Sequence, residues 1–162
     1  MSVKSMDDLF LHLMKDMYNA EKQLTKALPK MAKNAKTPEL KKAFETHLVE
    51  TEGQIERLES IFDMISKPAR GKTCAAMEGL VEEAKEAMDE IEDPEVLDAA
   101  LLAGAQAVEH YEISRYGTMV AMASQLGLSD AAKLLQEPLA EEKKTDELLN
   151  KLALATVNKK AA

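Results

Sequence analysis

Two glutamates in the middle of an apolar segment are the residues of this sequence best suited to chemistry. The segment is Val108-Glu109-His110-Tyr111-Glu112-Ile113, within an alanine-rich stretch that favours a helix. An α-helix repeats about every 3.6 residues, so Glu109 and Glu112 project from one face. A buried carboxylate must be paired, protonated or bound to a metal, so we expect partners on other helices. The face of these two glutamates also carries Leu102, Ala105, Tyr116, Met119 and Ala123.

Start and stop signals predict the helices that would supply those partners. Side chains that commonly cap helices stand at Ser5, Thr37, Thr73, Asp93 and Ser129. The predicted helices cover about 6–34, 38–65, 74–91, 94–126 and 130–157. Pro29 is expected to kink the first helix or to end it early.

The lengths of the connections predict the topology. Short turns near Ala35 and Gly127 would join two antiparallel hairpins. The loop at 66–72 and the short helix after it allow a long crossover between those hairpins. We therefore predict an all-α, ferritin-like four-helix bundle with a crossover connection and one extra short helix, in a single domain over 1–162.

Composition excludes several classes of protein. The formal charge of −8 argues against a nucleic-acid or anionic-membrane partner, because both would repel the chain. Asp7 and Asp8 stand where a signal peptide would be apolar, and no apolar run approaches the length of a membrane span. The single cysteine, Cys74, excludes an internal disulfide and suits a reducing compartment. We expect a cytoplasmic protein.

Counting outward from each turn matches acidic residues at equal depths in the predicted bundle. Residues equidistant from the turn of an antiparallel hairpin face each other, and most of the matched acids also follow the apolar stripe of their helix. Six acids from four helices would thus meet at mid-bundle. The pairs are Glu21 with Glu50, Glu112 with Glu142, and Glu109 with Asp146.

Converging carboxylates in a bundle core are typical of sites for two divalent metal ions, which bridging carboxylates hold about 3.5–4 Å apart. An oxygen-rich set suits iron, with manganese as the alternative. Any one of these acids taken alone would be read as a solvated surface residue, but six on inward faces at matched depths favour a metal site. His47 could be a ligand or a core histidine bonded to a carboxylate, and Gln54 could be a weak ligand or a residue that supports one.

Five segments and two single residues carry a resemblance to a known family. They are residues 18–24, 50–54, 57–59, 108–112 and 141–143, with His47 and Asp146. On these residues the chain resembles the ferritin-like superfamily, in particular the bacterial YciF family of stress-associated ferritin-like proteins. The resemblance implies a di-iron-type site and a homodimer. A Glu-x-x-His pair is absent, however, because Gly53 and Thr145 stand three residues after Glu50 and Glu142.

Two functions from different classes fit this reading. In the first, the protein binds iron(II) and oxidises it with dioxygen or peroxide under stress. In the second, a non-catalytic homodimer takes part in the stress response, and the metal or a shared proton only holds the bundle together. An iron-storing cage is a third, less favoured hypothesis.

Overall fold

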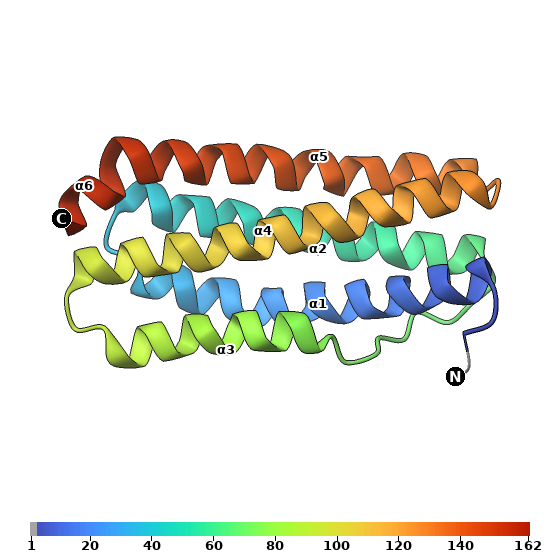
Figure 1. Ribbon diagram of the computed structural model, residues 1–162, viewed down its shortest axis with the longest axis horizontal. Coiled ribbons are helices and arrows are strands. Elements are labelled where there is room, and N and C mark those ends of the chain that lie inside the picture. The colour runs from blue at the N-terminus through green and yellow to red at the C-terminus, as the bar shows by residue number, and fades with distance from the viewer. Residues whose placement is uncertain (1–2) are drawn as a thin grey trace.

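The protein is a bundle of helices, shown by a computed structural model that describes residues 3–162 (Figure 1). The elements of the described range are helical throughout, as predicted. A last pair, the π-helix η1 (Ala153–Val157) and the short helix α6 (Asn158–Ala161), ends the chain. The longer helices are α1 (Met6–Asn34), α2 (Pro38–Met64), α3 (Ala75–Glu90), α4 (Pro94–Gln125) and α5 (Ser129–Leu152).

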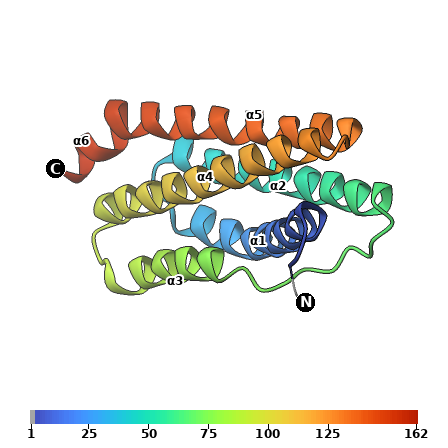
Figure 2. The ribbon, with the colours of Figure 1, turned by 45° about the vertical axis from the view of Figure 1, so that its right-hand side comes forward.

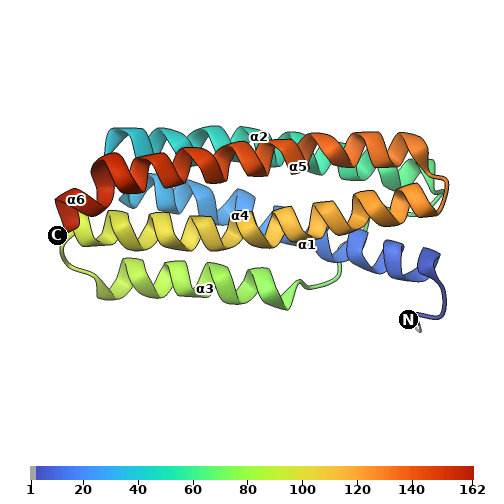
Figure 3. The same ribbon diagram turned by 45° about the horizontal axis from the view of Figure 1, so that its top comes forward.

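Two hairpins build the bundle, and α3 lies outside it. Helices α1 and α2 form the first hairpin and α4 and α5 the second, while α2 packs on α5 and α1 packs on α4 (Figure 2). Helix α3 covers α1 and α4 (Figure 3). The loop at 65–74 together with α3 returns the chain to the end of the bundle where α2 began, so α4 runs parallel to α2 (Figure 1). The predicted crossover and the extra short helix are confirmed.

Two of the predicted caps form as expected. The Ser5 hydroxyl accepts a hydrogen bond from the Asp8 backbone N–H at 3.1 Å. Asp93 accepts from the backbone N–H groups of Glu95 and Val96. These bonds satisfy donors that the first helical turn would otherwise leave free. Gly127 follows the end of α4 and has a φ of 74°, a conformation that favours glycine.

Other helix boundaries differ from the prediction. Helix α3 is capped at Cys74 instead of Thr73, and Ser129 is the first residue of α5 instead of its cap. Thr37 precedes α2, yet its side chain makes no capping bond. Helix α1 continues through Pro29 to Asn34, since a proline deprives a long, packed helix of one hydrogen bond without ending it.

A buried aspartate binds the two residues that precede α2. Asp98 on α4 is 1% exposed, and its two carboxylate oxygens accept from the backbone N–H groups of Lys36 and Thr37, each at 2.7 Å. The turn between α1 and α2 is therefore held on α4. Such a contact between distant segments fixes how the two hairpins lie against each other.

The crossover loop is held on α1 by backbone hydrogen bonds to two residues, Asn19 and Lys15. The Asn19 amide oxygen accepts from the Cys74 backbone N–H at 2.8 Å, and the Lys72 backbone N–H donates to the Lys15 carbonyl at 3.0 Å. Gly71 passes so close to Asn19 that a Cβ there would lie 3.1 Å from the Asn19 Cβ. A side chain at position 71 would push the loop away from the helix.

Candidate metal centre

Five side chains that can bind metals meet in the middle of the bundle. Glu21 comes from α1, His47 from α2, Glu109 and Glu112 from α4, and Glu142 from α5. None of these residues is more than 2% exposed. Each belongs to the buried face of its helix, as Met17 and Leu24 beside Glu21 and Phe44 before His47 illustrate. Packing of these buried faces against one another brings the five residues together.

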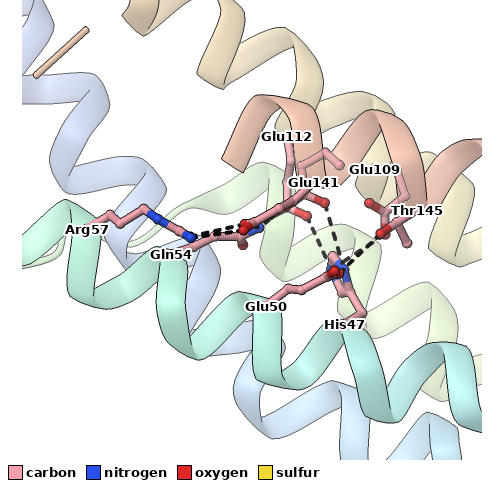
Figure 4. Close-up of polar contacts among 9 residues, drawn as sticks. His47, Glu50, Gln54, Arg57, Glu109, Glu112, Glu141 and Thr145 are labelled. Atoms are coloured by element: carbon pink, nitrogen blue, oxygen red, sulfur yellow. Dashed lines mark hydrogen bonds and ion pairs between the residues drawn. The ribbon is translucent and has the colours of Figure 1, made fainter. Parts of the chain in front are cut away.

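His47 stands among the carboxylates of this cluster. Its Nε2 atom lies 3.5 Å from Glu109 Oε1 and 3.7 Å from Glu112 Oε2, and its Nδ1 atom lies 3.8 Å from Glu142 Oε2 (Figure 4). Ligand atoms of these four residues all lie within 4.8 Å of one another. Metal–oxygen and metal–nitrogen bonds are about 2.0–2.3 Å long, so one ion between the four side chains would contact several of them with small adjustments.

Many polar atoms of the cluster lack a hydrogen-bond partner among residues 3–162. Both ring nitrogens of His47 and both carboxylate oxygens of Glu112 are in this state. One carboxylate oxygen of each of Glu21, Glu109 and Glu142 also lacks a partner there. Buried polar atoms normally find partners, because leaving one unpaired costs about 1–3 kcal/mol. Such a concentration at one place is typical of a group that binds something.

The electrostatics of the metal-free cluster favour protonation. Burial raises the pKa of Glu21 well above its usual range, and the charges of Glu112 and Glu142 raise it further. Burial also raises the pKa of Glu112 and of Glu109, with the neighbouring Glu142 adding to both shifts. Carboxylates with a raised pKa must lose protons before a cation binds, so metal and protons compete for this cluster.

One phenol group and one amide group each orient a carboxylate of the cluster. Tyr116 is fully buried on α4, and its hydroxyl donates to Glu21 Oε1. Gln54 on α2 is also fully buried, and its amide nitrogen donates to Glu142 Oε1. The structure thus places Gln54 against a cluster carboxylate, with its amide oxygen unpaired among the described residues.

An ion pair between Arg57 and Glu141 holds the Gln54 amide in place. Arg57 donates to both carboxylate oxygens of Glu141, at 3.0 and 3.1 Å, and to Glu137 at 2.8 Å. Glu141 Oε2 in turn accepts from the Gln54 amide at 3.1 Å (Figure 4). Neither Arg57 nor Glu141 was predicted as a site residue. Two signals could have indicated a role: their spacing, three residues after Gln54 and one before Glu142, and their place in two of the segments that carry the family resemblance.

Glu50 lies at the edge of the cluster instead of inside it. Its side chain is 21% exposed, and Glu50 Oε2 lies 3.9 Å from His47 Nδ1. The Thr145 hydroxyl donates to the same oxygen at 3.4 Å. Partial burial raises the pKa of Glu50, while the His47 and Lys144 charges oppose that rise. Glu50 therefore links the buried cluster to solvent.

Asp146 is the one predicted site residue that the structure places away from the cluster. Its carboxylate lies 3.1 Å from Nε2 of His110, whose side chain is 69% exposed. The inward face of α5 carries Glu142, Thr145 and Leu149. Residue 146 is turned about 100° from residue 145, so matching depth along the hairpin was not enough to bring it inside.

Comparisons with known proteins assign the chain to a family. The model of a domain of unknown function, DUF892, matches residues 5–162. The chain belongs to the DUF892 family. A relative of this DUF892 chain, Protein YciF of Escherichia coli K12, is 52% identical over 162 residues, which cover 99% of the chain and 98% of that protein.

Solved structures agree with this assignment. The crystal structure of the E. coli stress protein YciF matches with a TM-score of 0.92 and 51% identity, over 97% of this DUF892 chain and 99% of that one. YcfI from Rhodopseudomonas palustris, provisionally described as a structural protein, matches with a TM-score of 0.90 and 48% identity, over 92% of this chain and 95% of that one. A Xanthomonas campestris protein at 23% identity and a TM-score of 0.73 shares the fold. The predicted relationship to YciF is confirmed.

A helix that crosses a lipid bilayer must be both long and predominantly apolar. Within residues 3–162, no helix combines the length and the apolar character needed to cross one.

Proposed function

We propose that this DUF892 chain is a ferritin-like di-metal protein of the bacterial stress response, which binds two divalent ions, iron or else manganese, at the mid-bundle cluster. The observation that supports the proposal is the group of His47, Glu109, Glu112 and Glu142, which offer one ligand atom each within 4.8 Å of one another and each carry an unpaired buried polar atom among the described residues. The similarity to the E. coli stress protein YciF supports the setting.

The charge of the cluster suits two divalent ions. Glu21, Glu109, Glu112 and Glu142 are all buried, and when ionised they carry four negative charges that two divalent ions would neutralise. Isolated charges of this kind are not stable in a protein interior. Oxygen ligands with a single imidazole favour iron and manganese over soft-ligand metals such as copper(I).

Each side chain has a role in the proposed centre. Glu21, His47, Glu109, Glu112 and Glu142 would hold the ions, and iron would supply an electron donor for dioxygen or peroxide. Around them, buried apolar residues exclude bulk water. The Tyr116 and Gln54 hydrogen bonds keep two of the carboxylates in one orientation. We further propose that the chain acts in the cytoplasm as a homodimer.

Metal analysis tests the proposed centre. We expect protein purified without chelators to hold close to two iron or manganese ions per chain. The double variant Glu112→Gln/Glu142→Gln, which keeps the side-chain shapes, should lose most of that metal. Asp146→Asn is the matched control, because Asp146 lies on the same helix as Glu142 but outside the cluster. Equal metal content in all three proteins would refute the proposal.

Iron oxidation is measured on the same samples. The metal-free protein given iron(II) should consume dioxygen or peroxide and gain ferric absorption in the near ultraviolet, and the double variant should do so only at the rate of the buffer. Iron that binds at full stoichiometry without consuming oxidant would remove the catalytic part of the proposal and leave the metal site.

The alternative function is a structural one. The provisional description of YcfI as a structural protein favours it. In that case the metal joins the four helices without turnover. The alternative predicts a marked fall in melting temperature on chelation, together with silence in the oxidant assay.

A further inference from the structure

A groove on the surface of the molecule leads to the candidate metal centre. It has a volume of about 260 Å³, lies between α2 and α5, and includes Glu50 in its lining. Three other grooves in the described part of the chain, of about 320 to 330 Å³, are lined neither by the five buried cluster residues nor by Glu50. The groove between α2 and α5 reaches Glu50, the residue at the edge of the cluster. Its lining is Ala43, Thr46, Glu50, Lys144, Thr145, Glu147, Leu148 and Lys151.

Two small side chains border both this groove and the interior beside the cluster. Ala43 and Thr145 line the groove, and they also line an inner cavity of about 10 Å³ whose wall includes His47 and Glu109. Thr145 stands three residues after Glu142, where a Glu-x-x-His pair would place a much larger imidazole. The small side chain leaves the interior within reach of the surface.

Glu50 connects the two sides of this wall. It is the partly exposed acid beside four buried ones, and its Oε2 atom lies 3.9 Å from His47 Nδ1. That nitrogen is buried and has no hydrogen-bond partner within residues 3–162. From His47 the carboxylates of Glu109, Glu112 and Glu142 are all within 4 Å. Figure 4 shows Glu50 and His47 side by side on α2, facing Thr145 on α5.

We propose that divalent cations enter the cluster through the groove between α2 and α5, with Glu50 as the side chain that takes them from solvent. This entry route rests on the proposed metal-binding function. A carboxylate at the end of a groove offers the cation an oxygen ligand while it loses water. The next ligand, His47, is close enough for the cation to be held by both residues before it passes inward.

The experiment measures how fast metal-free protein takes up cobalt(II), whose visible absorption reports binding to protein ligands, in a stopped-flow instrument. Thr46→Trp places a large side chain over the groove from an exposed position. We expect cobalt uptake on the order of tenfold slower, with unchanged absorption at saturation, because an indole covers much of such an opening. Thr25→Trp, at a half-buried site on α1 outside the groove, is the control and should bind at the wild-type rate.

A second variant tests the route in the opposite direction. Lys144→Gln removes a positive charge near Glu50 and should speed uptake about two- to fivefold at low ionic strength, with the gain shrinking as salt rises. Lys133→Gln, on the same helix but paired with Asp130 away from the groove, should have no such effect.

The outcomes separate the entry route from the metal site itself. Wild-type uptake rates in both Thr46→Trp and Lys144→Gln, in proteins with wild-type circular dichroism, would overturn the entry route and leave the metal site standing. Reduced cobalt content without slower uptake in Thr46→Trp would also overturn it. Wild-type protein that binds no cobalt at all would refute the metal site.

Discussion

At the scale of single residues, the candidate centre is an arrangement of buried acids that the protein alone does not stabilise. Glu112 has both carboxylate oxygens unpaired among the described residues, and the ring of His47 has both nitrogens unpaired. In the metal-free state, protonation lowers the cost of burying the carboxylates. The state of these few side chains therefore depends on pH and on cation concentration.

The metal-free protein should become less stable as pH rises. Burial raises the folded-state pKa of Glu21, Glu109 and Glu112 above the value of 4.5 expected in the unfolded chain. Above pH 4.5 the folded state binds more protons than the unfolded state, so the free energy of unfolding falls with increasing pH. Urea unfolding in chelator between pH 5 and 8 measures this. Glu112→Gln should flatten the dependence, and a stability that rises over this range would contradict the prediction.

Removal of the Tyr116 hydroxyl should destabilise the metal-free protein. Tyr116→Phe leaves a buried oxygen of Glu21 without its donor, and we expect a loss of about 1–3 kcal/mol in the free energy of unfolding. Denaturant unfolding in chelator checks this value. If added metal takes over the orientation of Glu21, the difference between variant and wild type should shrink in its presence.

At the scale of elements, the registration of the helices decides which residues meet. Four long helices bring their inward faces together over the cluster, and α3 covers α1 and α4 from outside. Asp98 fixes the turn between α1 and α2 on α4 through two backbone N–H groups. A shift of one hairpin along the other would separate Glu21 from Glu112, so we regard Asp98 as important for the site although it lies far from it.

Loss of the Asp98 carboxylate should destabilise the bundle. Asp98→Ala leaves two backbone donors near the turn without acceptors, which we expect to cost about 2–4 kcal/mol because both bonds involve a charged acceptor. The control is Glu95→Ala, which removes only the half-exposed ion pair with Lys36 and should cost no more than about 1 kcal/mol. Thermal unfolding of both variants measures the difference, and equal melting temperatures would show that Asp98 does not hold the turn.

At the scale of the whole molecule, the centre joins all four helices of the bundle. Each helix contributes at least one side chain within the cluster or at its edge, so an ion bound there would connect the two hairpins. A ligand that binds only the folded state raises stability in proportion to the logarithm of its concentration. The stability of the bundle should therefore report occupancy of the site.

Metal should raise the melting temperature of this chain in a concentration-dependent way. At a free metal concentration 100-fold above the dissociation constant, the gain is about 2.7 kcal/mol for each ion. Differential scanning calorimetry across a manganese(II) series measures it without oxidation chemistry. The Glu112→Gln/Glu142→Gln variant should show no such rise, and a rise of equal size in that variant would place the stabilising ion elsewhere.

The helices, the two hairpins, the crossover and the convergence of acids could be predicted from the amino-acid sequence. These features follow from local signals, namely apolar periodicity, capping residues and the lengths of the connections. To predict that Glu112 faces Glu142, only the position of the turn near Gly127 was needed. The buried positions of Glu21, Glu109 and His47 followed from the apolar stripes of their helices.

Which of the predicted residues lie inside depends on how the helices are rotated against one another in the folded bundle, since a rotation of a helix by one residue moves a side chain by about 100°. That rotation turned Asp146 toward His110 at the surface and left Glu50 at the edge. The contacts of Gln54, Glu141 and Arg57 likewise depend on how α2 faces α5. No pattern within one helix contains that information, because it arises from packing between segments more than 80 residues apart.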